Sequence, residues 1–213
     1  MMLYVDAISD GVENLGPGRR IGLWVQGCTL GCPGCMSPEL FHRREECALP
    51  VTEVARQILA RSPGHDGLTI SGGEPFQQAR ALCRMLSMVH RHWSADVLVY
   101  SGYSIAEILD DPRGKARLLT EIDMLMDGRF EVSHENTRLW RGSDNQRLHI
   151  LTPRAECHRW AQEAAYPGER TMQYEFSRDG RLRLIGIPER GFDRLFVAKT
   201  RTHGLELRRG VRR

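Results

Sequence analysis

The stretch Cys28-Thr-Leu-Gly-Cys32-Pro-Gly-Cys35 decides how the rest of the chain is interpreted. Its three cysteines follow a C-x3-C-x2-C pattern, which is short enough for three thiolates to converge on one site. Three thiolates leave a structural zinc site incomplete, because such sites are almost always four-coordinate. They can instead hold three irons of a [4Fe–4S] cluster, which ordinarily takes four cysteines, and leave one iron open. A zinc knot completed by Cys47 or His42 is the alternative interpretation.

A glycine-rich stretch, Ser71-Gly72-Gly73-Glu74-Pro75, follows a predicted strand further along the chain. Together the two motifs resemble the radical S-adenosylmethionine (radical SAM) superfamily. The resemblance implies that Cys28, Cys32 and Cys35 bind the cluster and that the open iron binds the amino and carboxylate groups of SAM. It further implies that one electron cleaves SAM to give a 5′-deoxyadenosyl radical, and that the glycine-rich stretch, from Ser71 onward, lies along the methionyl group.

The same resemblance assigns further residues to SAM binding. Gly34 would line the pocket, and Met36 stands where most members carry an aromatic residue beside the adenine, although methionine offers a similarly polarizable contact. Gly72 and Gly73 lack side chains, so their backbone can approach a bound ligand closely. Glu74 would accept a hydrogen bond from the SAM amino group; alternatively, it is an acid favoured at a helix N-terminus.

Other segments resemble the glycyl-radical activase branch of the superfamily. Gly16-Pro17-Gly18 precedes the cysteine strand, as in that branch. Ser101 and Gly102 begin a Ser-Gly-Tyr segment that matches a SAM-contacting segment there, with a simple strand-to-helix turn as the alternative. The segments Asp127 to Phe130 and Trp140 to Arg147 are similar to motifs of the anaerobic ribonucleotide reductase activating proteins.

The Trp140 to Arg147 segment is rich in hydrogen-bond donors. Arg141 and Asn145 would bind the carboxylate or ribose of SAM, or they would brace the barrel. The sequence leaves both interpretations open.

The composition is that of an ordinary globular protein, with 213 residues of which 41% are hydrophobic and 27% charged. A net charge of +3 is too small to indicate nucleic-acid binding, and the basic residues 208–213 are interpreted as a solvated end. No apolar run indicates a signal peptide or a membrane span. The remaining cysteines, Cys47, Cys83 and Cys157, are scattered rather than arranged as a disulfide framework, so we expect a cytoplasmic protein.

Apolar runs predict buried strands at 21–25, 68–70, 97–100 and 123–127, with flanking strands at 1–8 and 148–151. Helices are expected after Thr52 as N-cap, over 76–89 with Cys83 in its apolar stripe, and from a capping box at Ser104 and Glu107. Alternating strands and helices predict a parallel α/β sheet whose motifs share one face. The resemblance sharpens this to a partial (β/α) barrel of the radical SAM type over residues 1–151.

The composition changes after residue 151. Residues 152–213 are predicted to form a small C-terminal extension, with a polar linker that contains a short helix near Trp160. Alternating residues around Asp179-Gly180 predict a β-hairpin. A short amphipathic helix is expected after Pro188, with Gly204 as its C-cap.

Three functions are consistent with these patterns. The resemblance implies a radical SAM enzyme that activates a glycyl-radical enzyme, such as an anaerobic ribonucleotide reductase, with electrons from flavodoxin or ferredoxin. The extension favours a second hypothesis, in which the same core modifies another small molecule, peptide or protein, since a shared fold does not fix the substrate. The third hypothesis is a non-enzymatic metal-binding module, against which the open coordination position argues.

Overall fold

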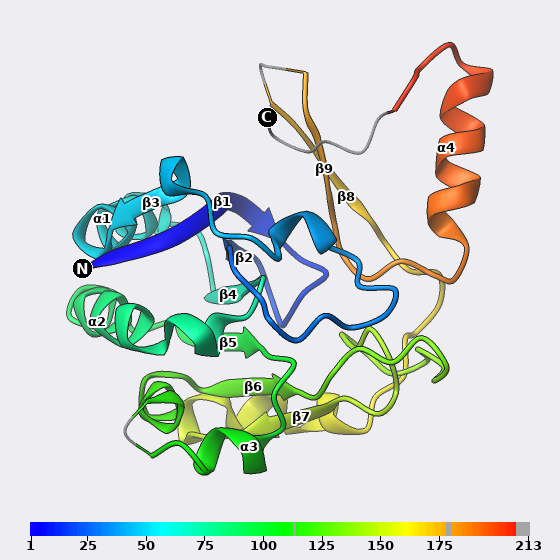
Figure 1. The fold of residues 1–213 in the computed structure, drawn as a ribbon. Helices are drawn as coiled ribbons and strands as arrows, with labels where there is room; N and C mark the ends of the chain where they lie inside the picture. The colour runs from blue at the N-terminus through cyan, green and yellow to red at the C-terminus, as the bar shows by residue number, and fades with distance from the viewer. Residues whose placement is uncertain (113, 178–179, 208–213) are drawn as a thin grey trace.

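The fold is mixed α/β, and the computed structural model describes residues 1–112, 114–177 and 180–207 (Figure 1). Seven strands form one sheet in the order β3-β1-β2-β4-β5-β6-β7. Their bounds are β1 Met2–Val12, β2 Arg20–Val25, β3 Ala48–Pro50, β4 Gly67–Gly72, β5 Asp96–Tyr100, β6 Met124–Asp127 and β7 Arg147–Ile150. The strands β2, β4, β5 and β6 are parallel, whereas β1, β3 and β7 run antiparallel to their neighbours.

Helices α1 (Val51–Arg61) and α2 (Ala79–Val89) pack against one face of the sheet, and α3 (Ile105–Leu109) follows β5. Short 3-10 segments complete the core: η1 Pro38–Leu40, η2 Glu45–Cys47, η3 Pro75–Gln78 and η4 Lys115–Glu121. Strand residues point alternately to the two faces. In β5, Val97 and Val99 join the core under the helices, while Leu98 packs with Met124 and Met126 on the other face. Burial on both faces explains why the parallel strands are nearly continuous apolar runs.

Two segments after residue 151 pack on the face of the sheet opposite α1 and α2. The 3-10 segment η5 (Pro153–Gln162) places Ala155 and Ala161 in the core beside Leu98. The hairpin of β8 (Gln173–Phe176) and β9 (Leu182–Ile185) leads Ile185 and Ile187 onto Val12 of β1. Helix α4 (Phe192–Thr202) contributes no buried residue and lies beyond the hairpin, away from α1 and α2 (Figure 1).

Most of the predicted elements are confirmed, including the four parallel strands and the hairpin strands. The capping box is also confirmed, since Ser104 Oγ accepts from Glu107 N and the Glu107 carboxylate accepts from Ser104 N. Gly204 N donates to Arg201 O just after α4, as a C-terminal cap does. Residue Asp179 of the predicted turn and the basic residues 208–213 lie outside the described residues.

Three details of the prediction differ from the structure. Thr52 is not the N-cap of α1, because Pro50, whose ring fixes φ near −57°, ends β3 and caps the helix one residue before Val51. The helix expected over 76–89 begins only at Ala79, since Pro75 starts a 3-10 turn. Strand β7 is antiparallel to β6, so the sheet is mixed rather than parallel throughout.

Cys83 is half-buried against the core, as its position in the apolar stripe of the predicted helix indicated.

None of the described helices combines the length and the apolar character that crossing a membrane requires. The cytoplasmic location stays a prediction.

A buried ion pair joins the parallel strands near the ends where they begin. The Arg20 side chain at the start of β2 is fully buried, and its Nη2 lies 2.6 Å from Asp96 Oδ1 on β5. Its Nε donates to Thr69 Oγ1 of β4 at 2.7 Å. A Cβ at Gly67 would lie 2.3 Å from Arg20 Nη1, so the glycine makes room for the guanidinium. Arg20 therefore joins β2, β4 and β5 across the sheet.

Replacing Arg20 with methionine should destabilise the fold by about 3–5 kcal/mol, because it leaves the Asp96 carboxylate buried without its counter-charge. The double variant Arg20→Met/Asp96→Asn should recover a large part of that loss. Urea denaturation of the cluster-free protein measures both. Equal losses in the single and double variants would show that the ion pair is not the source of the effect.

Candidate functional site

The cysteine loop begins where β2 ends, at the edge of the sheet where the parallel strands finish. Gly27 N donates to Leu40 O at 2.8 Å and Cys28 N to Phe41 O at 2.9 Å, so η1 holds the start of the loop. Further along, Cys35 N donates to Cys32 O at 3.1 Å and closes a tight turn. Gly31 and Gly34 have φ values of +60° and +73°, a backbone region that favours glycine. All three thiols are partly exposed.

The electrostatics of the loop suit a bound cation. Burial raises the pKa of the Cys28 and Cys35 thiols, and neighbouring thiolates raise both pKa values further. Three adjacent thiolates therefore need a positive partner to stay ionised, and thiolate donors are the usual ligands of iron–sulfur clusters. The three cysteines fit such a group.

No group of three or more His, Cys, Asp or Glu side chains in the described part of the chain has the arrangement of a single-ion site. Among the described residues, the three thiols of the cysteine loop are thus not gathered around one ion, as the spacing suggested. A cluster does not require that, because each cysteine binds a different iron atom.

The glycine pair at the end of β4 packs against the start of the cysteine loop. Gly73 N donates to Val25 O at 2.7 Å, and Glu74 N donates to Gly27 O at 2.8 Å. A Cβ at Gly72, where φ is +110°, would lie 2.5 Å from Val25 O. A Cβ at Gly73 would lie 2.5 Å from Gly27 O. The close approach that requires glycine is therefore made to the backbone of Val25 and Gly27, whereas the sequence suggested an approach to a ligand.

Glu74 is buried, with 1% of its surface exposed, and each carboxylate oxygen accepts from the chain itself. Oε1 accepts from Phe76 N and from Ser101 Oγ, both at 2.9 Å. Oε2 accepts from Gly102 N at 2.8 Å. Glu74 thus caps η3, as its alternative interpretation held, and also ties β4 to the segment after β5. Burial raises the pKa of Glu74 to about 7, although the three hydrogen bonds act in the opposite direction.

The structure brings Ser71, Ser101 and Gly102 together with Glu74 at the same edge of the sheet. Ser101 Oγ also accepts from Tyr103 N at 3.0 Å, so the segment is both a structured strand-to-helix turn and a neighbour of the cysteine loop. A Cβ at Gly102 would lie 2.4 Å from Leu30 Cδ1 of that loop. Gly102 therefore lies against the cysteine loop.

Arg141 and Asn145 differ in how their polar groups are used. Arg141 is buried, and its guanidinium donates to Gln146 O at 2.8 Å and Gln162 O at 2.6 Å. These contacts favour the bracing role over SAM binding. Asn145 Nδ2 donates to Arg129 O at 2.9 Å, while its Oδ1 is buried without a hydrogen-bond partner among the described residues. The structure therefore gives Asn145 two partners for its amide nitrogen and none for its oxygen among the described residues.

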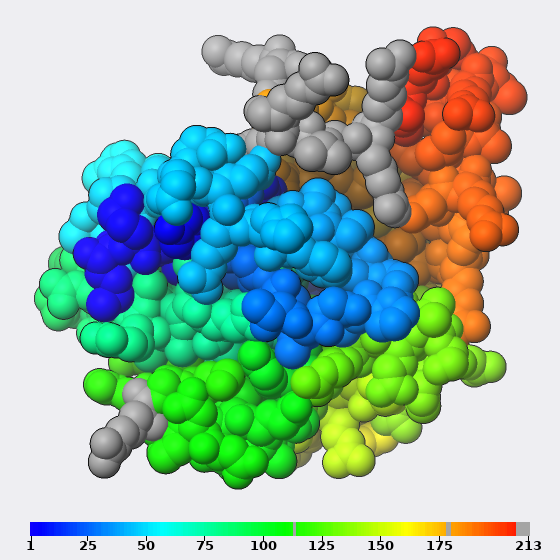
Figure 2. All heavy atoms as spheres, in the orientation of Figure 1, coloured from blue at the N-terminus to red at the C-terminus, as the bar shows by residue number. Residues whose placement is uncertain are grey.

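A further contact was not predicted from the sequence. A Cβ built at Gly34 would lie 3.6 Å from Phe130 Cε1 and 3.6 Å from Val132 Cβ, in the segment after β6. Figure 2 shows the blue cysteine loop lying directly against this green segment. Met36, two residues further, is 46% exposed at the rim. In the sequence, only the resemblance of Asp127 to Phe130 to a family motif indicated that this segment belongs near the cysteine loop.

Comparison with known proteins decides the family. A family model described as a 4Fe-4S single cluster domain matches residues 14–149. The chain belongs to this family. The predicted [4Fe–4S] cluster is thereby confirmed.

Relatives of this protein carry one and the same name, and they confirm the family predicted from the motifs. An anaerobic ribonucleoside-triphosphate reductase-activating protein of Pasteurella multocida is 35% identical over 71% of this chain and 99% of the relative. The protein of the same name from Enterobacteria phage T4 is 31% identical over 62% of this chain and 85% of the relative. The crystal structure of QueE from Escherichia coli matches 62% of this chain and 74% of that chain at 13% identity, with a TM-score of 0.45. That last likeness is too weak to argue from.

The packing of the glycine pair generates a test of the cluster domain. Gly73→Ala should destabilise the protein by about 1–3 kcal/mol and lower the iron bound per chain, because the new methyl group displaces the backbone of Gly27. Gly168→Ala is the matched control, since nothing lies within 4 Å of a Cβ there. Denaturation and iron analysis of both variants make the measurement. Normal stability and iron content in Gly73→Ala would contradict this packing.

The buried carboxyl of Glu74 predicts a pH dependence. Its pKa is raised from 4.5 to about 7 in the folded protein, so the folded state binds more protons than the unfolded state in this range. The contribution of Glu74 to stability should therefore be largest below about pH 4.5 and fall by up to about 3 kcal/mol as pH rises to about 7. The difference in unfolding free energy between wild type and Glu74→Gln, measured by urea denaturation of the cluster-free protein across this range, should fall accordingly. A pH-independent difference would refute the assignment.

Proposed function

We propose that the protein is a radical SAM enzyme that cleaves SAM reductively and uses the resulting 5′-deoxyadenosyl radical to activate a glycyl-radical enzyme. The observation that carries the proposal is the cysteine loop, which offers three partly exposed thiols at the carboxyl edge of the parallel strands. Two comparisons support the same function. The chain belongs to the 4Fe-4S single-cluster family, and its relatives are named as reductase-activating proteins.

In this proposal Cys28, Cys32 and Cys35 hold the cluster, which supplies the electron for SAM cleavage when bound. Three cysteines leave one iron without a protein ligand from this motif, where SAM is held. In the same proposal the sheet corresponds to a partial (β/α) barrel of the radical SAM type, whose active site lies at the carboxyl ends of the strands.

The proposed SAM-binding residues divide by what they offer in the structure. Gly34 and Met36 belong to the cysteine loop, and Ser71, Gly72 and Gly73 to the end of β4. Both carboxylate oxygens of Glu74 accept from the chain's own groups, so Glu74 acts on SAM chiefly by holding Ser101 and Gly102 in place. Asn145 offers its free Oδ1, whereas Arg141 braces the neighbouring turn.

The proposed partner is a glycyl-radical enzyme such as an anaerobic ribonucleotide reductase, from whose glycine Cα the radical takes a hydrogen atom. The proposed electron donor is a flavodoxin or ferredoxin, and the proposed location is the cytoplasm. Residues 1–151 form the radical SAM core and residues 152–213 its extension in this account.

A second function is favoured by one observation. The Pasteurella multocida relative is matched over 99% of its length by 71% of this chain, so this chain carries a segment without a counterpart there. Helix α4 lies beyond residues 14–149, which the family model matches, and none of its residues is buried. The core would then act on another small molecule, peptide or protein, with the extension involved in its recognition.

The test uses anaerobically purified protein with its cluster reconstituted and reduced. With SAM, the wild type should release 5′-deoxyadenosine, and Cys32→Ala should release essentially none because one cluster ligand is lost. Leu195→Ala on α4, where the side chain is 72% exposed, is the control and should retain activity. Adding an anaerobic ribonucleotide reductase should produce a glycine-centred radical in its electron paramagnetic resonance spectrum. Deoxyadenosine without any glycyl radical would favour the second function, and no deoxyadenosine from a loaded, reducible cluster would exclude both.

A further inference from the structure

The cysteine loop has little internal support of its own. Among the described residues, the only backbone–backbone hydrogen bond within residues 29–36 joins Cys35 N to Cys32 O. Its first residues are anchored through Cys28 N to Phe41 O, but the turn from Cys32 to Cys35 lies beyond that anchor. What holds this turn is therefore contact with another part of the chain.

Phe130 and Val132 make that contact at Gly34, and the ring of Phe130 lies between two glycines. A Cβ at Gly34 would lie 3.6 Å from Cε1 of the ring, which is ordinary van der Waals contact. On another edge, a Cβ at Gly142 would lie 3.2 Å from Cδ2, which is closer than most real contacts allow. Phe130 is thus packed between the cysteine turn and the turn that contains Gly142.

Gln146 fixes the relation between these two segments. Its Oε1 accepts from Gly142 N at 2.8 Å, and its Nε2 donates to Gly128 O at 2.9 Å. Ser143, which is fully buried, adds a bond from Glu131 N to its Oγ at 3.0 Å. The Gln146 side chain therefore joins the backbone just before Phe130, at Gly128, to the turn at Gly142 on the other edge of the ring.

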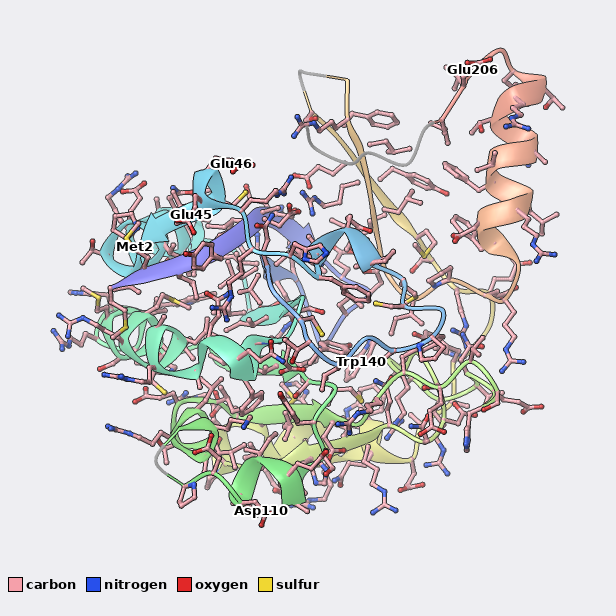
Figure 3. All side chains as sticks on the ribbon, in the orientation of Figure 1. Met2, Glu45, Glu46, Asp110, Trp140 and Glu206 are labelled. Carbon is pink, nitrogen blue, oxygen red and sulfur yellow. The ribbon has the colours of Figure 1, made fainter. Side chains whose placement is uncertain are left out.

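Trp140 anchors this arrangement to the core. It is 6% exposed, packs in the cluster with Met124 and Met126, and meets the Trp160 ring at a tilt of 60° with ring centroids 6.0 Å apart. Its backbone has φ +58°, which is uncommon for a residue with a side chain, and the chain turns there toward Gly142. Figure 3 shows Trp140 within the body of the molecule, in contrast to Glu206 beyond the end of α4.

We propose that Gln146 and Phe130 are positioning residues that seat the Cys32–Cys35 turn for cluster binding, with the Trp140–Gln146 turn as their support. This assigns a role to the motif Trp140 to Arg147 that requires no contact with SAM. The inference rests on the cluster family and not on the proposed substrate.

The test measures thiol accessibility in the cluster-free protein under anaerobic conditions. Alkylation by iodoacetamide is followed at each cysteine by peptide mass spectrometry. In Phe130→Ala and Gln146→Ala, the rates at Cys32 and Cys35 should rise about threefold or more relative to Cys28, because the turn opens locally. Phe130→Leu should restore part of the protection, since leucine still fills the space between the glycines.

Gln173→Ala is the matched control, because Gln173 also bridges backbone groups, Glu13 N and Gly11 O, but on the hairpin. It should leave all three rates unchanged. Buried Cys47 reports global unfolding, and if it reacts faster in Phe130→Ala the decision passes to Gln146→Ala and Phe130→Leu.

Unchanged rates at Cys32 and Cys35 in folded variants, or an equal rise in Gln173→Ala, would overturn the inference. A second readout is the iron bound per chain after reconstitution, which should fall in Phe130→Ala and recover in Phe130→Leu. Neither readout depends on SAM cleavage, so this inference and the proposed function can fail independently.

Discussion

The structure of the site depends on one backbone contact, the packing of Gly73 and Glu74 onto Val25 and Gly27. Two hydrogen bonds, at 2.7 and 2.8 Å, join the end of β4 to the residues that lead into Cys28. No side chain fits at either glycine, because a Cβ would come within 2.5 Å of a carbonyl oxygen. The cysteine loop therefore leaves the sheet at a fixed point, and Glu74 follows at a fixed position beside it.

From that contact, hydrogen bonds extend across the edge of the sheet. Glu74 connects β4 to Ser101 and Gly102 after β5, and Gly102 lies against Leu30 of the cysteine loop. Below them, Arg20 and Asp96 join the same strands within the sheet. A buried carboxyl with a raised pKa and a buried ion pair are costly features in a small fold. Here Glu74 lies at the carboxyl ends of the parallel strands, beside the cysteine loop, and the ion pair joins the same strands where they begin.

The sequence predicted what depends on local pattern. Apolar runs located β2, β4, β5 and β6, and the spacing of Cys28, Cys32 and Cys35 predicted a [4Fe–4S] cluster, which the family match confirms. It could not predict what depends on distant pairing. Glycines at 72 and 73 signal a close approach, but not that the approaching backbone is that of Val25 and Gly27. The contact of Phe130 with Gly34 and the direction of β7 likewise arise from the tertiary fold. Pro50 displaced Thr52 as the cap of α1 because β3, which was not predicted, ends there.

The central claim is that this edge of the sheet forms a SAM site only when the three cysteines hold the cluster. Isothermal titration calorimetry of SAM into the reconstituted and the cluster-free protein tests it most directly. The account predicts that about one SAM binds per chain with the cluster present and that binding is lost or greatly weakened without it, since the open iron is a ligand of SAM. Equal binding in both forms, or none to the fully loaded protein, would contradict it.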